Sequence, residues 1–173
     1  VWGAEGVAGG WRRGVRESRG GAETSRARGG SFAAGGGDKG NVCIPACAVG
    51  RSQELLYWFA KHWDDWQLSR WQLFLDSPMA AKVVSVYDRH EELFDADAQQ
   101  VWKQKPNPFE LPNLHITQTR DESMAINRIE SGAIIIAGSG MANGGRILHH
   151  FMQNISRRES HIVFVGYQAE GTL

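Results

Sequence analysis

Cysteine is scarce in this sequence, and no long hydrophobic run occurs. The 173 residues include two cysteines, Cys43 and Cys47, and their spacing matches neither a zinc-binding pattern nor a disulfide framework. We interpret both as small buried hydrophobic residues. No stretch approaches the ~20 apolar residues of a membrane-spanning helix, and the first residues lack the layout of a secretory signal. The sequence therefore predicts a soluble, cytoplasmic protein with no membrane partner.

The chain also lacks an excess of charge of either sign, because 19 Lys and Arg residues balance 19 Asp and Glu residues. This balance hides a difference between two segments. Residues 1–40 hold seven basic and four acidic side chains, whereas residues 41–173 hold 12 and 15. A net charge of zero argues against strong non-specific binding of the whole chain to nucleic acid, since that affinity arises mainly from neutralised phosphates.

Residues 1–38 contain almost no aliphatic side chain. Of the 21 glycines, 13 lie in the first 40 residues, mixed with Arg, Ser and Ala. Such a segment cannot bury enough apolar area to offset the entropy lost on ordering, so we expect a disordered leader or an artefactual one. Its Arg-Gly stretches at 11–14 and 26–30 leave a second interpretation open, a disordered RNA-binding tail.

From residue 39 onward, apolar runs of strand length alternate with segments of helical periodicity. The expected strands are residues 41–49, 72–75, 115–117, 132–137 and 161–165. The expected helices are residues 51–66, 79–94, 121–129 and 144–154, and the proline-rich segment 105–114 is expected to be a loop. The alternation predicts one α/β domain over 39–173 with an open, mainly parallel sheet of about five strands, right-handed crossovers and helices on both faces.

The unusual residues follow the predicted strands. In an open parallel sheet the carboxyl ends of the strands lie along one edge, where ligands bind and helix N-termini supply free N–H groups. The segments that follow the five strands are 50–51, 76–77, 117–119, 138–141 and 166–168. Their small residues, hydroxyls, backbone amides and single arginine suit a sugar-phosphate chain, and they offer few groups for bond-breaking chemistry.

The segment 138–145, Gly-Ser-Gly-Met-Ala-Asn-Gly-Gly, is the most distinctive of these turns. It resembles the dinucleotide-binding pattern G-x-G-x-x-G, but Asn143 occupies the place of the last glycine and no acidic residue closes the next strand. We favour a phosphate-binding turn at a helix start over a nicotinamide or flavin site. A turn that is merely tight stays open as an alternative.

Charged residues at these turns each have two interpretations. Arg51 is either a phosphate contact or the ion-pair partner of an acid such as Asp76. Asp121 and Glu122 fall where helix caps are expected, and we favour capping over acid-base chemistry for both. Asp121 is the expected cap of the helix over 121–129.

The histidine pair at 149–150 lies on one predicted helix. Adjacent residues on a helix diverge by about 100°, so these two side chains are poorly placed to share a metal ion. No partner ligand stands at a useful spacing, and we expect no metal site from them.

Four blocks of the sequence resemble one known domain. They are residues 44–56 (Ile-Pro-Ala-Cys-Ala-Val-Gly-Arg-Ser-Gln-Glu-Leu-Leu), 75–80 (Leu-Asp-Ser-Pro-Met-Ala), 137–150 (Ala-Gly-Ser-Gly-Met-Ala-Asn-Gly-Gly-Arg-Ile-Leu-His-His) and 165–173 (Val-Gly-Tyr-Gln-Ala-Glu-Gly-Thr-Leu). In this order they look like the β-CASP domain of RNA-processing nucleases with the metallo-β-lactamase fold, a group that includes the mRNA 3′-end cleavage endonuclease. The likeness is to the bacterial branch, covers residues 40–173 and leaves the leader unmatched.

The resemblance implies a parent enzyme that hydrolyses RNA phosphodiester bonds with two zinc ions held between its metallo-β-lactamase and β-CASP domains. The family's His-x-His-x-Asp-His motif is absent from this sequence, and the two β-CASP histidines would follow Leu173. We therefore interpret both ends as cut and expect no catalytic residue, no metal ligand and no activity in this chain alone. The implied partners are RNA and the metallo-β-lactamase domain of the same parent, and a homo-oligomer stays open.

Seven residues are the expected RNA-phosphate contacts: Arg51, Ser139, Gly140, Met141, Asn143, Gly144 and Arg146. Backbone N–H groups and the two guanidinium groups would make most of these contacts. One alternative is a stand-alone, weak RNA-binding protein that uses the Arg-Gly leader with the glycine turns. A dinucleotide-dependent oxidoreductase is the least favoured hypothesis.

Overall fold

The computed structural model describes residues 40–103 and 107–171, so the leader predicted over 1–38 lies outside the described residues. The strands are β1 (Val42–Pro45), β2 (Gln72–Asp76), β3 (Leu114–Thr117), β4 (Ala133–Ala137) and β5 (His161–Ile162). The α-helices are α2 (Arg51–Lys61), α3 (Pro78–Asp88), α4 (Ala96–Lys103), α5 (Arg120–Ile126) and α6 (Arg146–Asn154). Two 3₁₀ turns, η1 (Leu68–Arg70) and η2 (Glu91–Leu93), complete the order.

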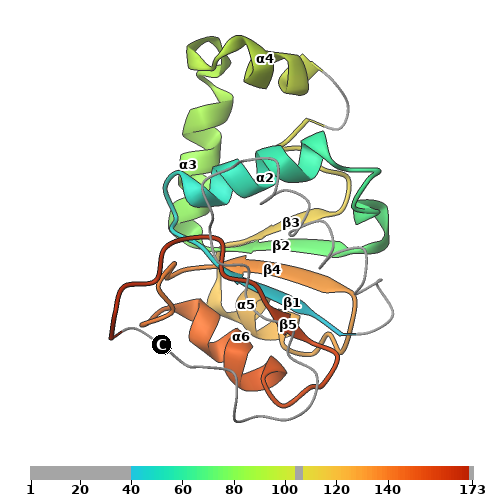
Figure 1. The fold of residues 1–173 in the computed structure, drawn as a ribbon, viewed down its shortest axis with the longest axis vertical. Coiled ribbons are helices and arrows are strands. Elements are labelled where there is room, and N and C mark those ends of the chain that lie inside the picture. Colours follow the sequence, from blue (N-terminus) through green and yellow to red (C-terminus); the bar gives the residue numbers. More distant parts are fainter. Residues whose placement is uncertain (1–39, 104–106, 172–173) are drawn as a thin grey trace.

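The five strands form one sheet in the order β3-β2-β4-β1-β5, and every pairing is parallel (Figure 1). β4 occupies the centre, with Ile136 opposite Ile44 of β1 and Leu75 of β2. All five of its residues are buried, as expected of a central strand in a parallel sheet that is covered on both faces. The predicted α/β class is confirmed.

Alternate residues of the strands face two separate cores, because side chains along a strand point to opposite sides of the sheet. Ile44, Leu75 and Ile136 pack with the aliphatic and aromatic residues of α2, whereas Cys43 and Ile135 pack with α6. Figure 1 shows α2 and α3 on one side of the sheet and α5 and α6 on the other. The prediction of helices on both faces is thereby confirmed.

The structure differs from the sequence prediction in the region after α3. The predicted helix over 79–94 ends at Asp88 and is followed by the 3₁₀ turn η2 and the helix α4, which was not predicted. A carboxylate oxygen of Asp95, Oδ1, accepts from the N–H of Ala98 at 2.8 Å and so stabilises the start of α4. The predicted strand over 161–165 is also shorter and comprises only His161–Ile162.

Two local predictions were wrong. Thr119, not Asp121, caps α5: its hydroxyl accepts from the N–H of Glu122, whose carboxylate accepts from the N–H of Thr119. Glu122 is thus a capping residue as expected. Cys47 is exposed, because the turn after β1 carries it out of the sheet, whereas Cys43 is buried and burial raises its pKa to about 12.

Within the described residues, none of the helices combines the length and apolar character needed to cross a membrane.

The carboxyl ends of the parallel strands lie along the same edge of the sheet (Figure 1). Helices α2, α3 and α6 begin there, directly after the turns that follow β1, β2 and β4. We call this the carboxyl edge and define it by the segments 46–51, 76–77, 117–119, 138–146 and 166–168. The edge therefore collects the blocks that the sequence analysis singled out.

Candidate functional site

The glycine turn, residues 138–145, folds back on itself between β4 and α6. The N–H of Ser139 donates to the carbonyl of Gly144 at 3.1 Å, and the N–H of Ala142 donates to the carbonyl of Ser139 at 3.1 Å. The Ser139 hydroxyl donates to Asn143 Oδ1 at 2.8 Å and accepts from the Asn143 N–H at 3.2 Å. The predicted site residues Ser139 and Asn143 therefore hold the turn in one shape.

Other N–H groups of the glycine turn remain available. Among the residues that the structure describes, the N–H groups of Gly140, Met141 and Gly144 have no acceptor. All three residues are partly or fully exposed. Successive unpaired N–H groups in a turn form a concave site with partial positive charge, which suits an anion.

Two positions of this turn favour glycine. A Cβ on Gly140 would lie 2.7 Å from the Sγ of Cys47 and 3.1 Å from its backbone nitrogen, so the turn after β1 leaves little room for a side chain. Gly145 has φ +78°, and a Cβ there would collide with the carbonyl oxygen of Gly138. The side-chain amide of Gln168 also donates to the Gly140 carbonyl at 3.0 Å. Three of the four sequence blocks therefore meet at Gly140.

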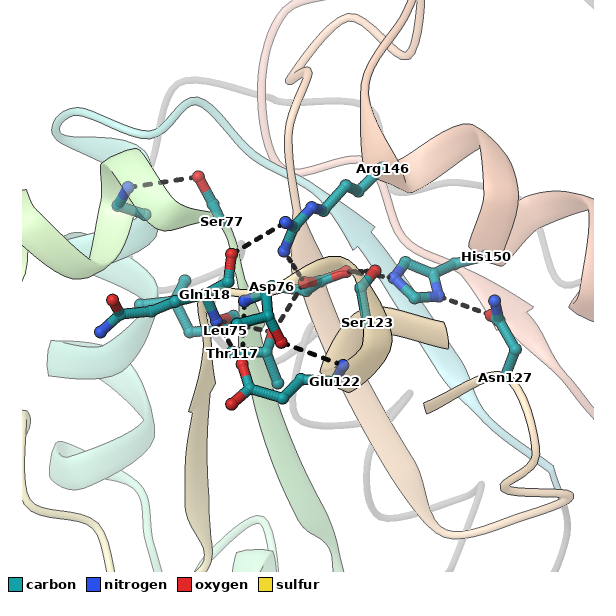
Figure 2. A network of polar contacts seen from close by, with 12 residues as sticks. Leu75, Asp76, Ser77, Thr117, Gln118, Glu122, Ser123, Asn127, Arg146 and His150 are labelled. Atoms are coloured by element: carbon teal, nitrogen blue, oxygen red, sulfur yellow. Dashed lines mark hydrogen bonds and ion pairs between the residues drawn. The ribbon is translucent and has the colours of Figure 1, made fainter. Parts of the chain in front are cut away.

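Asp76 is the centre of a second cluster on the carboxyl edge (Figure 2). Its buried carboxylate accepts four hydrogen bonds. Oδ1 accepts from the hydroxyl of Thr117 and from Nη1 of Arg146, each at 2.6 Å. Oδ2 accepts from the hydroxyl of Ser123 at 2.6 Å and from Nε2 of His150 at 2.7 Å. We call these five residues the Asp76 network, which joins β2, β3, α5 and α6.

The four donors keep Asp76 ionised. Burial alone would raise the pKa of this carboxyl group, because it disfavours the charged form. The hydrogen bonds from His150, Ser123, Thr117 and Arg146 outweigh the burial and hold the pKa of Asp76 far below its ordinary range. An ionised carboxylate only accepts, so Nε2 of His150 carries a proton, while Nδ1 lies 2.8 Å from Asn127 Oδ1. Asp76 is therefore a structural anion with no free lone pair for a metal ion or a substrate proton.

The two arginines of the predicted site have different partners. Arg51, the first residue of α2, forms an ion pair at 2.6 Å with Glu54, not with Asp76. Arg146 forms the ion pair with Asp76, and its Nη2 donates to the carbonyl of Gln118 at 3.0 Å (Figure 2). The main contacts of Arg146 link the ends of β2 and β3. Its side chain is 26% exposed, so only part of the guanidinium faces solvent.

Sequence reasoning missed Thr117, Ser123 and His150 as partners of Asp76. They are 41, 47 and 74 residues from it, a separation at which no local pattern links two positions. One signal was present: His150 interrupts the buried stripe of α6 between Ile147 and Phe151. A polar residue in an apolar stripe needs a buried partner.

The described residues do not fit the two-zinc centre that the resemblance implies. Within 40–103 and 107–171, no group of three or more His, Cys, Asp and Glu side chains could hold a metal ion. The pair of Asp76 and His150 falls short of the three protein ligands typical of a catalytic zinc site, and both side chains are already hydrogen-bonded.

Comparison with known proteins agrees with the fold and with these blocks. The Beta-Casp domain matches residues 52–173. Ribonuclease TTHA0252 of Thermus thermophilus is 42% identical over 134 residues, which is 78% of this chain and 31% of that protein. Transcription termination factor FttA of Cenarchaeum symbiosum is 31% identical over 140 residues, and FttA of Thermococcus kodakarensis is 34% identical over 137 residues.

The alignments to the two FttA proteins cover 79% and 78% of this chain but only 21% and 20% of the relatives. The chain thus spans less than a third of the length of these relatives. The family match covers more than half of the chain and includes both the glycine turn and the Asp76 network. It therefore assigns the chain to one family. The chain belongs to the β-CASP family, whose domains form part of RNA-processing nucleases with the metallo-β-lactamase fold.

Proposed function

We propose that this β-CASP domain grips the phosphate backbone of single-stranded RNA along its carboxyl edge. The parent nuclease would then hydrolyse RNA phosphodiester bonds with its metallo-β-lactamase domain. The observation that most supports the proposal is the glycine turn, where the N–H groups of Gly140, Met141 and Gly144 have no acceptor among the described residues. The names of the relatives, a ribonuclease and transcription termination factors, agree with RNA as the polymer.

Phosphate binding follows from the charges around the glycine turn. The turn leads directly into α6, whose N-terminus adds partial positive charge to that of the unpaired N–H groups. Arg146 neutralises the buried charge of Asp76, so the carboxylate repels an approaching phosphate less. Arg51 lies on the next turn of the same edge and contributes a second guanidinium. Backbone N–H groups that bind phosphates do not distinguish one base from another, so this binding is independent of the RNA sequence.

Bond cleavage is assigned to the parent and not to the residues described here. Those residues do not hold a metal-binding group, and Asp76, the buried carboxylate of the edge, is fully hydrogen-bonded. The role of this domain is to bind and orient RNA. The zinc dependence of the parent and the inactivity of this chain alone stay predictions.

A charge reversal at the glycine turn tests the proposal. Gly144→Asp adds a carboxylate where a Cβ would meet nothing within 4 Å, so the fold is expected to survive. We expect the affinity of the full chain for a single-stranded RNA to fall about tenfold, because the new charge repels phosphate, and its salt dependence to weaken. Fluorescence anisotropy with a labelled RNA measures both.

The matched control is Ser131→Asp, which adds the same charge at an exposed position two residues before β4, at the opposite edge of the sheet. We expect its RNA affinity to stay within twofold of the parent chain. Equal loss in both variants would contradict a grip at the carboxyl edge. If deletion of residues 1–38 abolished binding and its salt dependence, the Arg-Gly leader would be the RNA-binding element instead.

A further inference from the structure

A pocket of about 300 Å³ lies among α2, α3, η2 and α4. Figure 1 shows α4 at the far end of α3, beyond α2. Four aromatic residues line it, Tyr57, Tyr87, Phe94 and Trp102, together with the acidic residues Glu54 and Asp95. We propose that this pocket binds one guanine base of the RNA, an inference that rests on the proposed function for the identity of the polymer. The volume is at the low end for ligand pockets and suits a single base.

The aromatic walls suit a flat ligand. The rings of Phe94 and Trp102 stack with centroids 4.4 Å apart, and Tyr57 stacks on Trp102 at 6.2 Å. Tyr87 packs against Phe94 at 6.0 Å. Proteins that bind single-stranded RNA hold unstacked bases against such rings, and a stacked base contributes about 1–3 kcal/mol of binding free energy.

The carboxylates exclude phosphate and favour a ligand with N–H donors. Glu54 already accepts from Arg51 and from the indole of Trp58. Asp95 uses Oδ1 to accept from the N–H of Ala98, and its Oδ2 has no partner within the described part of the chain. The described residues that line the pocket include no Lys, Arg or His. A base can therefore enter this pocket where a phosphate is repelled.

Trp102 adds the opposite requirement, an acceptor. Its side chain is only 9% exposed, and its indole N–H has no acceptor among the described residues. The nitrogen itself is buried, so a ligand acceptor would pair with it only after the ring turns to present it to the pocket, and would then recover the free energy that an unpaired buried donor costs. An arginine side chain from a protein partner offers donors alone and would leave this N–H unpaired. A nucleobase offers both donors and acceptors on a flat ring.

Guanine matches the Asp95 carboxylate best, because Oδ2 has no partner in the described part of the chain and Oδ1 keeps a second lone pair beside the Ala98 N–H. Its Watson–Crick edge presents two adjacent N–H donors, which fit the two oxygens of one carboxylate, and O6 and N7 remain as acceptors. Adenine and cytosine place a ring acceptor beside the amino group, where it would face carboxylate oxygen. Uracil has one N–H between two carbonyls. Asp95 is thus the residue expected to distinguish guanine from the other bases.

The pocket adjoins the proposed path of the RNA. Gly50 lines the pocket and directly precedes Arg51, one of the expected phosphate contacts. A strand held along the carboxyl edge therefore passes the pocket mouth. The phosphate grip is independent of sequence, whereas this pocket would add a preference for one base.

Nucleosides separate this proposal from the proposed function, because they contain no phosphate. We expect calorimetric titration of the full chain to show guanosine binding about tenfold tighter than adenosine, cytidine or uridine, the discrimination of one bidentate contact. Asp95→Asn keeps a side-chain oxygen for the α4 start and should lose the guanosine preference. Trp102→Phe keeps the ring and removes the N–H, and should weaken guanosine binding at least fivefold.

The controls are Asp88→Asn and Trp63→Phe, two matched changes at residues that do not line the pocket. Both should bind guanosine within twofold of the parent chain. Equal affinity for the four nucleosides, an unchanged preference in Asp95→Asn, or tighter binding of a Gly-Arg peptide than of guanosine would overturn the guanine site. RNA binding without nucleoside binding would overturn the guanine site and leave the proposed phosphate binding standing. Guanosine binding without RNA binding would overturn the proposed phosphate binding and leave the guanine site standing.

Discussion

The Asp76 network and the glycine turn are neighbours on the carboxyl edge, but they use their polar groups in opposite ways. In the network, all four donors around the Asp76 carboxylate are satisfied inside the protein, and the carboxylate itself is fully buried. In the turn, the N–H groups of Gly140, Met141 and Gly144 have no acceptor among the described residues and lie at the surface.

This difference separates a structural role from a binding role. A saturated buried anion cannot gain from a ligand, and its contacts stabilise the packing of four elements. Unpaired N–H groups at a surface exchange water for a ligand at little cost. Changes in the network should therefore affect stability, and changes in the turn should affect RNA binding or the local backbone.

The largest expected effect comes from removing the charge of the network. Asp76→Asn keeps the shape of the side chain. It places an amide N–H₂ where the carboxylate accepted hydrogen bonds, so donors face donors, and it leaves Arg146 without its counter-ion. We expect the free energy of unfolding to fall by about 3–5 kcal/mol, as when one partner of a buried ion pair is removed. Urea denaturation measures it.

A surface carboxylate provides the control for this change. Asp88→Asn, at the exposed C-terminal end of α3, should stay within about 0.5 kcal/mol of the parent chain. A similar loss in both variants would show that the Asp76 network does not stabilise the fold more than a surface charge does.

The pH dependence of stability sharpens the same point. The pKa of Asp76 in the folded state lies below its ordinary value of 3.8. Its contribution to the free energy of unfolding is therefore complete above the unfolded-state pKa and is lost as the pH falls toward the folded-state pKa. We expect the stability difference between the parent chain and Asp76→Asn to be constant from about pH 5 to 7 and to shrink below about pH 4.

Unfolding free energies measured at a series of pH values test this expectation. The pKa of Glu122 is also lowered, chiefly by hydrogen bonds from the backbone N–H groups of Thr119 and Gln118, but this carboxylate is present in both proteins and cancels in the difference. A difference that grew on acidification would mean that Asp76 is protonated in the folded protein.

The smallest expected effects lie within the glycine turn. Gly145→Ala should lower the free energy of unfolding by about 1–3 kcal/mol, because φ is +78° and the new Cβ would strike the carbonyl of Gly138. Gly144→Ala, one residue earlier, meets nothing within 4 Å and should stay within about 0.5 kcal/mol. Equal melting temperatures for the two variants would show that the backbone of the turn is not as constrained as its geometry requires.

Much of the fold could be predicted because local periodicity encodes it. The apolar run at 132–137 indicated β4 and the segment at 72–75 indicated β2, and the structure has Ala133–Ala137 and Gln72–Asp76 there. The helix α4 escaped prediction, since its start depends on Asp95 and its position on the packing of Trp102 with Tyr57 of α2 rather than on a strong repeat. Cys47 was misplaced because burial depends on the path of a turn.

The candidate site divides in the same way. The glycine turn was recognisable because its residues are consecutive and their spacing is unusual, and Arg51 was recognisable because it follows a predicted strand. The partners of Asp76 were not, because Thr117, Ser123 and His150 come from three other elements. The guanine pocket was also invisible, since its walls combine α2, α3 and α4.

The amino-acid sequence alone determined the alternation of the five strands with α2, α3, α5 and α6, the parallel sheet and the edge on which the distinctive turns gather, because alternation and turn chemistry act over a few residues. Only the tertiary structure decided that Arg146 pairs with Asp76 while Arg51 pairs with Glu54. It also decided which N–H groups stay unpaired. Such choices depend on which side chains meet across the sheet, and residues far apart in the chain meet only once the backbone has folded.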